Sequence, residues 1–315
     1  MHDMPVRVAA FACVAAFAAA LPACTWSSES GTINERHVSS TTYTKADDVH
    51  WNGEHVRVVN VSGNIEIVGI PGLRKVELEA RPYAGAQNQE DADAAFADVI
   101  EGIRIEWVAT APDSSIYELV VECPNAAAVH GSADRATTGC DELIVKVPSG
   151  TTAEPLRLTA RADFGGIYAT GLVGDVILTA PFGISASITP TQGSTVSLVN
   201  DDLISGNCPV TLALPADFSA DQVAVSVESG LGEIVTSDFP GLQRTSCTIQ
   251  GEPQPCVTQP HGQLGQGASL VEAQSSIGDA VLLAMDASGQ PSQPLPWDRG
   301  GCVHKGYEVK ADVSP

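Results

Sequence analysis

The chain has 315 residues, of which 43% are hydrophobic, and its 38 Asp and Glu against 16 Lys and Arg give a formal net charge of −22. This length is enough for one large all-β domain or two ordinary domains. An acidic surface repels the phosphates of nucleic acids and of anionic lipids, so the composition argues against direct binding to either. The remaining roles for an acidic surface are to keep the protein soluble or to attract divalent cations or cationic partners.

The N-terminal residues 1–23 are predicted to be a targeting segment rather than part of the fold. Val8–Leu21 is apolar and rich in Ala, but it is too short for an ordinary membrane-spanning helix. It ends in Leu21-Pro22-Ala23-Cys24, which resembles the lipobox of bacterial lipoproteins. The resemblance implies that the Cys24 thiol takes a diacylglycerol and that the chain is cut before Cys24. The alternative is an ordinary secretory signal cut near Ala20 or Ala23.

The cysteine count fits a lipidated, exported chain. Cys13 leaves with the signal and Cys24 takes the lipid, so six of the eight Cys remain for three disulfides in an oxidising compartment. The predicted disulfides are two local pairs and one distant pair: Cys123–Cys140, Cys247–Cys256 and Cys208–Cys302. A zinc site built from Cys247, Cys256, His261, Cys302 and His304 is disfavoured because their spacing lacks the close ligand pairs of such sites.

The chain after the signal divides into three parts. Residues 24–45 are rich in Ser, Thr and Glu and predict a flexible tether between anchor and domain. Residues 46–285 are predicted to form the folded domain, with cysteine-bracketed insertions at 123–140 and 247–256. Residues 286–315 form a Pro- and Gly-rich tail. Thr25 follows Cys24, and the absence of an Asp there favours the outer membrane in a Gram-negative cell.

The domain shows strand periodicity with one helix. Apolar residues alternate through His55–Ala80, which predicts strands broken at Ser62-Gly63-Asn64 and Pro71-Gly72. Gln89–Glu101 predicts a helix that covers an open end of the core, with Asp91 and Asp93 in its first turn. The segment at 240–267, rich in Gln, Gly, Pro and Thr, predicts a long disulfide-pinned loop.

A repeat organises the centre of the domain. Leu158-Thr159-Ala160 returns as Leu178-Thr179-Ala180, and Leu198 falls one equal step further. Short strands alternate with glycine-containing turns across Leu143–Asn200, and each 20-residue step has room for two strands and two turns. Such a pattern predicts stacked coils, because a single coil cannot bury its own apolar face. A β-sandwich is the alternative from the same pattern.

The order of these motifs resembles the bacterial "putative adhesin" family with a "head GIN"-like β-solenoid domain. The matching segments are VNVSGNIEI, LIVKVPSGTT, ARADFGGIYATGLVGDVIL, TAPFGISASI, LALPADFSADQVAVSVESGLGEI and EAQSSIGDAVLL. The resemblance implies a right-handed parallel β-solenoid, or β-helix, of stacked short strands with one capping helix. It also implies an adhesin-like, non-catalytic role and no cofactor.

The sequence offers few candidates for catalytic residues. Three carboxylate pairs could serve a glycosidase: Asp47 with Asp48, Asp91 with Asp93, and Asp201 with Asp202. Each pair falls in a tether, a helix start or a strand-end turn, where Asp is favoured for structural reasons. Asp201 and Asp202 are also the best calcium-site guess. No nucleophile elbow or dinucleotide-binding loop is present in the sequence.

The sequence therefore predicts an envelope lipoprotein that acts as a binding or structural module, not an enzyme, on the cell surface or in the periplasm. Its predicted partners are the membrane, reached through the lipid on Cys24, and an envelope protein or a glycan. Two alternatives stay open: a polysaccharide lyase or hydrolase on a β-helix, and an accessory protein of envelope signalling.

Overall fold

The computed structural model describes residues 35–46, 50–111, 117–123, 138–200, 208–216, 223–229, 234–236, 243–249, 252–258, 269–276, 278–291 and 295. The described chain is all-β with one helix, which confirms the predicted class. None of the described helical residues forms a span long and apolar enough to cross a bilayer.

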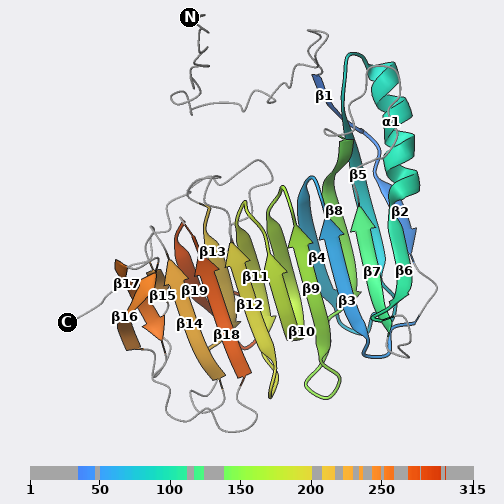
Figure 1. The fold of residues 1–315 in the computed structure, drawn as a ribbon. Helices are drawn as coiled ribbons and strands as arrows, with labels where there is room; N and C mark the ends of the chain where they lie inside the picture. The colour runs from blue at the N-terminus through green and yellow to red at the C-terminus, as the bar shows by residue number, and fades with distance from the viewer. Residues whose placement is uncertain are drawn as a thin grey trace, which may run out of the picture.

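The strands form two layers, which we call sheet I and sheet II (Figure 1). Sheet I runs in the spatial order β6 (Arg104–Ala109), β7 (Tyr117–Cys123), β3 (His55–Asn60), β9 (Leu156–Ala162), β10 (Ile167–Thr179), β12 (Thr195–Asn200), β18 (Ser269–Ser275), β14 (Val223–Ser229), β17 (Glu252–Thr258) and β16 (Gln243–Ile249).

Sheet II begins at the same end of the molecule. Its spatial order is β5 (Glu77–Ala86), which carries both β1 (Glu35–Val38) and β2 (Tyr43–Ala46) on its edge, and then β8 (Thr138–Pro148), β4 (Asn64–Ile70), β10, β11 (Ile184–Thr189), β13 (Val210–Pro215), β19 (Ala280–Met285) and β15 (Ile234–Thr236).

Strand β10 joins the two layers into one curled sheet. Its first part, from Ile167, pairs with β4 and β11 in sheet II. Its last part, from Gly174 to Thr179, pairs with β9 and β12 in sheet I. Gly171 and Gly174, which both have positive φ, lie where the strand passes from one layer to the other.

The strand order departs from a simple stack of coils. Seven strand pairs pass from sheet I to sheet II, and in space they run β7/β8, β3/β4, β9/β10, β10/β11, β12/β13, β18/β19 and β14/β15. The pairs β3/β4 and β18/β19 are each inserted between pairs that lie elsewhere in the sequence. Parallel pairing fills the centre, whereas antiparallel pairs close both ends. The result is a curled half-barrel rather than a plain parallel solenoid.

The predicted 20-residue register holds for only one step. Leu178 pairs directly with Leu198, as the repeat requires. Leu158, however, pairs with Val176, and Leu178 pairs with Ala160. The step between β9 and β10 is therefore two residues shorter than predicted, and each Leu keeps its inward direction because strand side chains alternate with a period of two.

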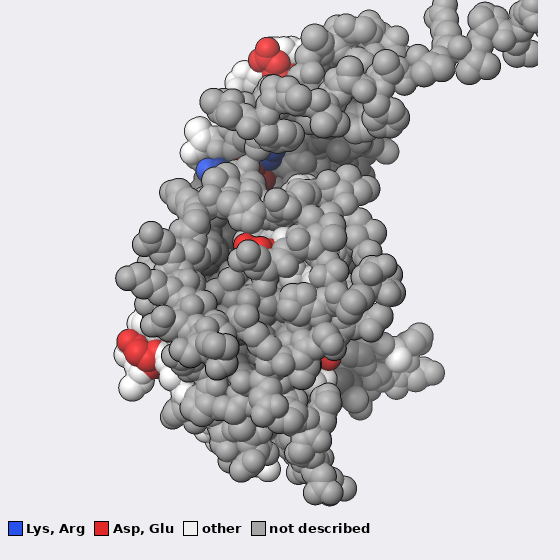
Figure 2. Space-filling view, turned by 90° about the vertical axis from the view of Figure 1, so that its left-hand side faces the viewer, with Lys and Arg blue, Asp and Glu red and all other residues white. Residues whose placement is uncertain are grey.

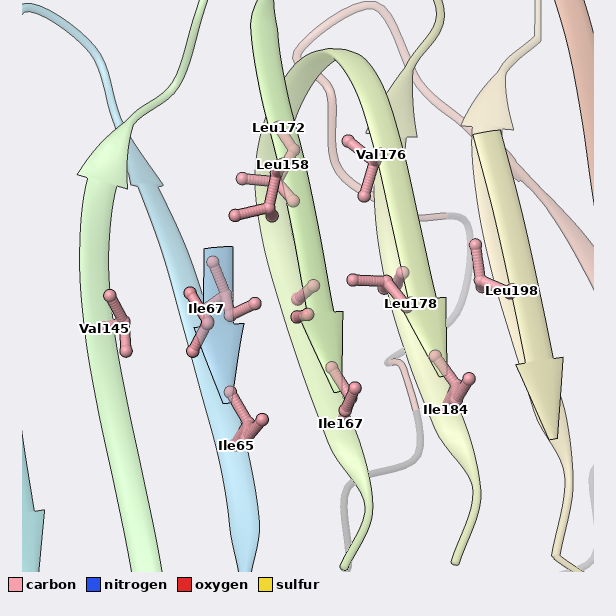
Figure 3. Close-up of a cluster of buried hydrophobic side chains, with 14 of the residues drawn as sticks. Ile65, Ile67, Val145, Leu158, Ile167, Leu172, Val176, Leu178, Ile184 and Leu198 are labelled. Atoms are coloured by element: carbon pink, nitrogen blue, oxygen red, sulfur yellow. The ribbon is translucent and has the colours of Figure 1, made fainter. Parts of the chain in front are cut away.

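The core lies between the two sheets. Strand β3 alternates half-buried and buried residues, and the buried apolar ones, Val56 and Val58, join a cluster that includes Ile65 and Ile67 of sheet II. Figure 3 shows Leu158 and Leu178 of sheet I in the same interior as Ile167 and Ile184 of sheet II. Burying one such side chain stabilises the fold by roughly 1.5–3 kcal/mol.

Backbone turns stack closely where the chain passes from sheet I to sheet II. Asn60 Nδ2 donates to the Cys140 carbonyl at 3.3 Å, and Ser275 Oγ donates to the Cys208 carbonyl at 3.2 Å. These buried side chains give hydrogen bonds to backbone carbonyls of neighbouring strand pairs. A Cβ on Gly165 would lie 2.1 Å from the Gly63 carbonyl oxygen, so only glycine fits there.

One end of the fold is closed by the helix α1 (Gln89–Gly102), which confirms the predicted helix. Its buried residues Ala92, Ala95 and Phe96 pack against Ala84 and Ala86 of β5. Residues 35–46, which the sequence assigns almost wholly to the tether, instead form β1 and β2 on the edge of β5. These short strands pair an edge that would otherwise be open to aggregation.

At the opposite end of the fold, the structure differs from the predicted long loop. The predicted loop at 240–267 contains an antiparallel hairpin of β16 and β17, with Thr245 opposite Cys256. In the tail, Leu295 packs against Ala213, Leu283 and Met285 on the outer side of sheet II.

Figure 2 shows the molecule from the end that carries β16 and β17. In this view the described carboxylates come to the surface at separate places and not as one continuous patch.

The close turn packing predicts the effect of Gly165→Ala. Because the new Cβ would meet backbone atoms of Gly63 and Asn64, which cannot move aside as a flexible side chain can, we expect a loss of about 3 kcal/mol or more in the free energy of unfolding. Chemical denaturation measures this loss. Gly72→Ala is the control: the space around Gly72 is open, so only its φ of +76° is strained, at a cost of about 1–2 kcal/mol. Equal or smaller loss for Gly165→Ala would contradict the steric argument.

Candidate binding surface

The predicted cysteine sites are only partly within the described residues. Cys123 and Cys140 form a disulfide with a Cα–Cα distance of 6.1 Å. Cys208 is also disulfide-bonded, and its partner is not among the residues whose side chains are described. Cys247 and Cys256 lie on β16 and β17, whose side chains are not described. Cys24 and Cys302 lie outside the described residues, as do His261 and His304.

The carboxylate pairs do not form a described catalytic site. Asp91 and Asp93 complete the start of α1: the Asp91 backbone N–H donates to Asn88 Oδ1 at 2.9 Å, and Asp93 Oδ1 accepts from Gln89 Nε2 at 2.7 Å. Asp47, Asp48, Asp201 and Asp202 lie outside the described residues. Within the described part of the chain, no group of three or more His, Cys, Asp and Glu side chains could hold a metal ion.

A different surface brings charged side chains together. The neighbouring strands β3, HVRVVN, and β9, LRLTARA, contain no carboxylate, although the whole chain has more than twice as many acids as bases. Their outward positions carry four basic side chains, which we call the basic stripe: His55, Arg57, Arg157 and Arg161.

The parallel register fixes how the basic stripe is laid out. His55 lies directly opposite Arg157, Arg57 opposite Thr159, and Val59 opposite Arg161. Neighbouring strands are about 4.8 Å apart, and residues two apart on one strand are about 6.6 Å apart.

Acidic side chains flank the basic stripe on both sides. On β7, Glu118 lies opposite His55 and Glu122 opposite Val59. On β10, Asp175 lies opposite Arg157. The basic stripe therefore lies between Glu118 and Glu122 on one side and a single acid, Asp175, on the other.

Ion pairs engage part of the basic stripe. Arg57 Nε donates to Glu118 Oε1 at 2.9 Å, and Arg161 Nε donates to Asp163 Oδ1 at 2.6 Å. Both arginines remain open to solvent, with 40% and 67% of their side-chain surfaces exposed. Arg157 is exposed and has no ion-pair partner among the described side chains. Exposed ion pairs contribute about 1 kcal/mol or less, so a ligand can replace them at little cost.

His55 sits in a crowded position within the stripe. Its Nε2 lies 2.9 Å from Thr159 Oγ1, and its Nδ1 lies 3.4 Å from Glu118 Oε2. Burial lowers the pKa of His55 below 6.5, and the charges of Arg157 and Arg57 act in the same direction, against the opposing effect of Glu118. The permanent cations of the stripe are therefore its three arginines.

Arginine determines what this surface can bind. The planar guanidinium presents a fork of N–H donors that matches a carboxylate or a phosphate, and it stays charged at any physiological pH. No proton-transfer group or nucleophile is needed for such binding. The basic stripe is therefore suited to holding an anionic ligand.

Sequence reasoning missed this surface. The outward alternation of Arg57 in β3 and of Arg157 and Arg161 in β9 is visible in the sequence. The sequence does not show that β3 lies beside β9, which follows it by about 100 residues. The two strands are neighbours because β7 pairs with the other edge of β3.

Comparison with known proteins does not assign a family or a function to this chain. No family model matches the chain, and no curated protein matches it. Two solved structures are similar: a "putative cell adhesion protein" from Clostridium sporogenes, at 12% identity and a TM-score of 0.41, and a "putative adhesin" from Bacteroides fragilis, at 9% identity and a TM-score of 0.27. Each likeness covers 78% of this chain and, respectively, 100% and 98% of the other. Both scores are too low to support an argument about fold or function.

The lowered pKa of His55 predicts a pH effect on stability. The unfolded chain, with a histidine pKa of about 6.5, takes up a proton more readily than the fold does. The stability that His55 contributes is therefore complete above about pH 6.5 and falls as the pH drops below that value. We expect His55→Gln to lose less stability than the native chain between about pH 7.5 and about pH 5.5. Denaturant titrations measure this, and an imidazole titration by NMR with a midpoint at or above 6.5 would contradict it.

Proposed function

We propose that the chain is an exported lipoprotein of the cell envelope whose folded domain is a non-catalytic binding module. We further propose that the domain is a variant of the right-handed parallel β-solenoid, in which the strand pairs next to each end are supplied out of sequence order. The usual right-handedness of parallel crossovers supports that hand.

The observation that carries the binding role is the outer face of sheet I. Its side chains stand in register on strands that are paired on both sides, so their positions are fixed by the sheet and not by loops. Charged and hydroxyl side chains project from this face, and the basic stripe gives it a local charge opposite to that of the whole protein. Such an arrangement favours recognition spread over a surface.

Two features support export and anchoring. The Cys123–Cys140 disulfide is typical of a protein that folds in an oxidising compartment. The sequence at Cys24 provides the anchor in this proposal, and several acyl chains on one residue hold a protein stably at a membrane. The outer membrane is the proposed location, and an envelope protein or a glycan is the proposed partner.

Intact mass spectrometry of the membrane-extracted protein tests the anchor. We expect a chain that begins at Cys24, carries the mass of its acyl groups, and lacks six thiol hydrogens because three disulfides have formed. Cys24→Ser removes the acylated thiol and should leave the protein unlipidated. A native mass that matches cleavage without lipid would refute the anchor.

A further inference from the structure

We propose that the basic stripe binds a glycan that carries carboxylates, such as a polymer of uronic acids. This inference rests on the proposed binding function and adds the chemical class of the ligand. The residues assigned to the contact are Arg57, Arg157 and Arg161, with hydroxyl side chains beside them.

Charge complementarity gives the sign of the ligand. Arg157 and Arg161 lie on the same face of β9, about 13 Å apart along the strand, and Arg57 lies between them on β3. Three forks at this spacing match anionic groups distributed along an extended chain rather than a single small ion. Arg157 is the central contact because it is exposed and has no ion-pair partner among the described residues.

The flanking acids set an upper limit on the charge density of the ligand. Glu118, Glu122 and Asp175 lie on the strands next to the stripe, and Asp163 pairs with Arg161. A heavily sulfated or phosphorylated chain would place several charges against these carboxylates, and the net charge of −22 would repel it further. Single carboxylates spaced along a sugar chain can meet the arginines without crowding the acids.

The position of the stripe within the sheet argues against an acidic peptide. Strand β3 pairs with β7 and β9, and β9 pairs with β3 and β10, so no strand edge is open for an added peptide strand. Recognition at the stripe must use side chains alone, and that suits a ligand whose own polar groups are hydroxyls and carboxylates.

The neighbouring side chains fit sugar rings. Thr159 lies opposite Ile177, so one row across the face places a half-buried hydroxyl beside an exposed apolar side chain, whereas Ser197, the next residue in that row, is buried. Ile177 is 41% exposed, which is unusual for a large apolar side chain on this face. A pyranose ring presents C–H groups on its faces and hydroxyls around its rim, and this row can meet both.

Binding of the full-length protein to polygalacturonate tests the proposal. Calorimetry in non-ionic detergent compares polygalacturonate with its methyl ester, which has the same backbone without charge, and with heparin and poly-glutamate. We expect polygalacturonate to bind best, to bind more weakly as salt is raised, and to lose binding on esterification. Tighter binding of heparin or poly-glutamate, or equal binding of the methyl ester, would overturn the ligand assignment.

Two matched variants locate the site. Arg157→Gln should weaken polygalacturonate binding about tenfold or more, since it removes a charge-assisted contact. Arg104→Gln removes an arginine from β6, which is also in sheet I but outside the stripe, and should change the affinity by less than about twofold. Equal effects of the two variants would overturn the role of the stripe while leaving the binding function intact. Failure of every glycan and of every envelope protein to bind would refute the binding function itself.

Discussion

The structure depends on burial that no strand pair achieves alone. The inward residues of a pair such as β3 and β4, among them Val58 and Ile67, become fully buried only when other pairs stack on both sides. Stacking in turn requires the turns to come within van der Waals contact, which is why glycine stands at Gly63 and Gly165 and why Asn60 donates to a carbonyl of a neighbouring pair. Burial of the core, close approach of the turns and hydrogen bonding of the buried polar groups therefore depend on one another.

The basic stripe is a product of the same stacking. Arg57 and Arg157 lie about 100 positions apart in the sequence, and they meet only because the β3/β4 pair is held between β7/β8 and β9/β10. The inward side chains of β3 and β9 are fixed by the core, so the outward ones are presented at set intervals. The basic stripe therefore needs no loop to position it.

The sequence was a good guide where the signal is local. The alternation of Val56 and Val58, the helix from Gln89 and the local pair Cys123–Cys140 each depend on residues close in the chain. Pairing between distant strands was not predictable. A two-residue shift leaves every inward residue inward, so the Leu158–Leu178 repeat was misleading about register. The hairpin of β16 and β17 was missed because Pro253 and Pro255 read as breakers, although they lie in an end strand pair where proline is tolerated.

The insertion of β18/β19 between β12/β13 and β14/β15 has a consequence for how the protein is made. A chain synthesised from its N-terminus exposes β14 and β15 before their parallel neighbours β18 and β19 exist. That end of the fold stays open until residues 269–285 arrive. Folding of this half is therefore completed only after nearly the whole chain has been made, and assistance that keeps β14 from aggregating matters most during that interval.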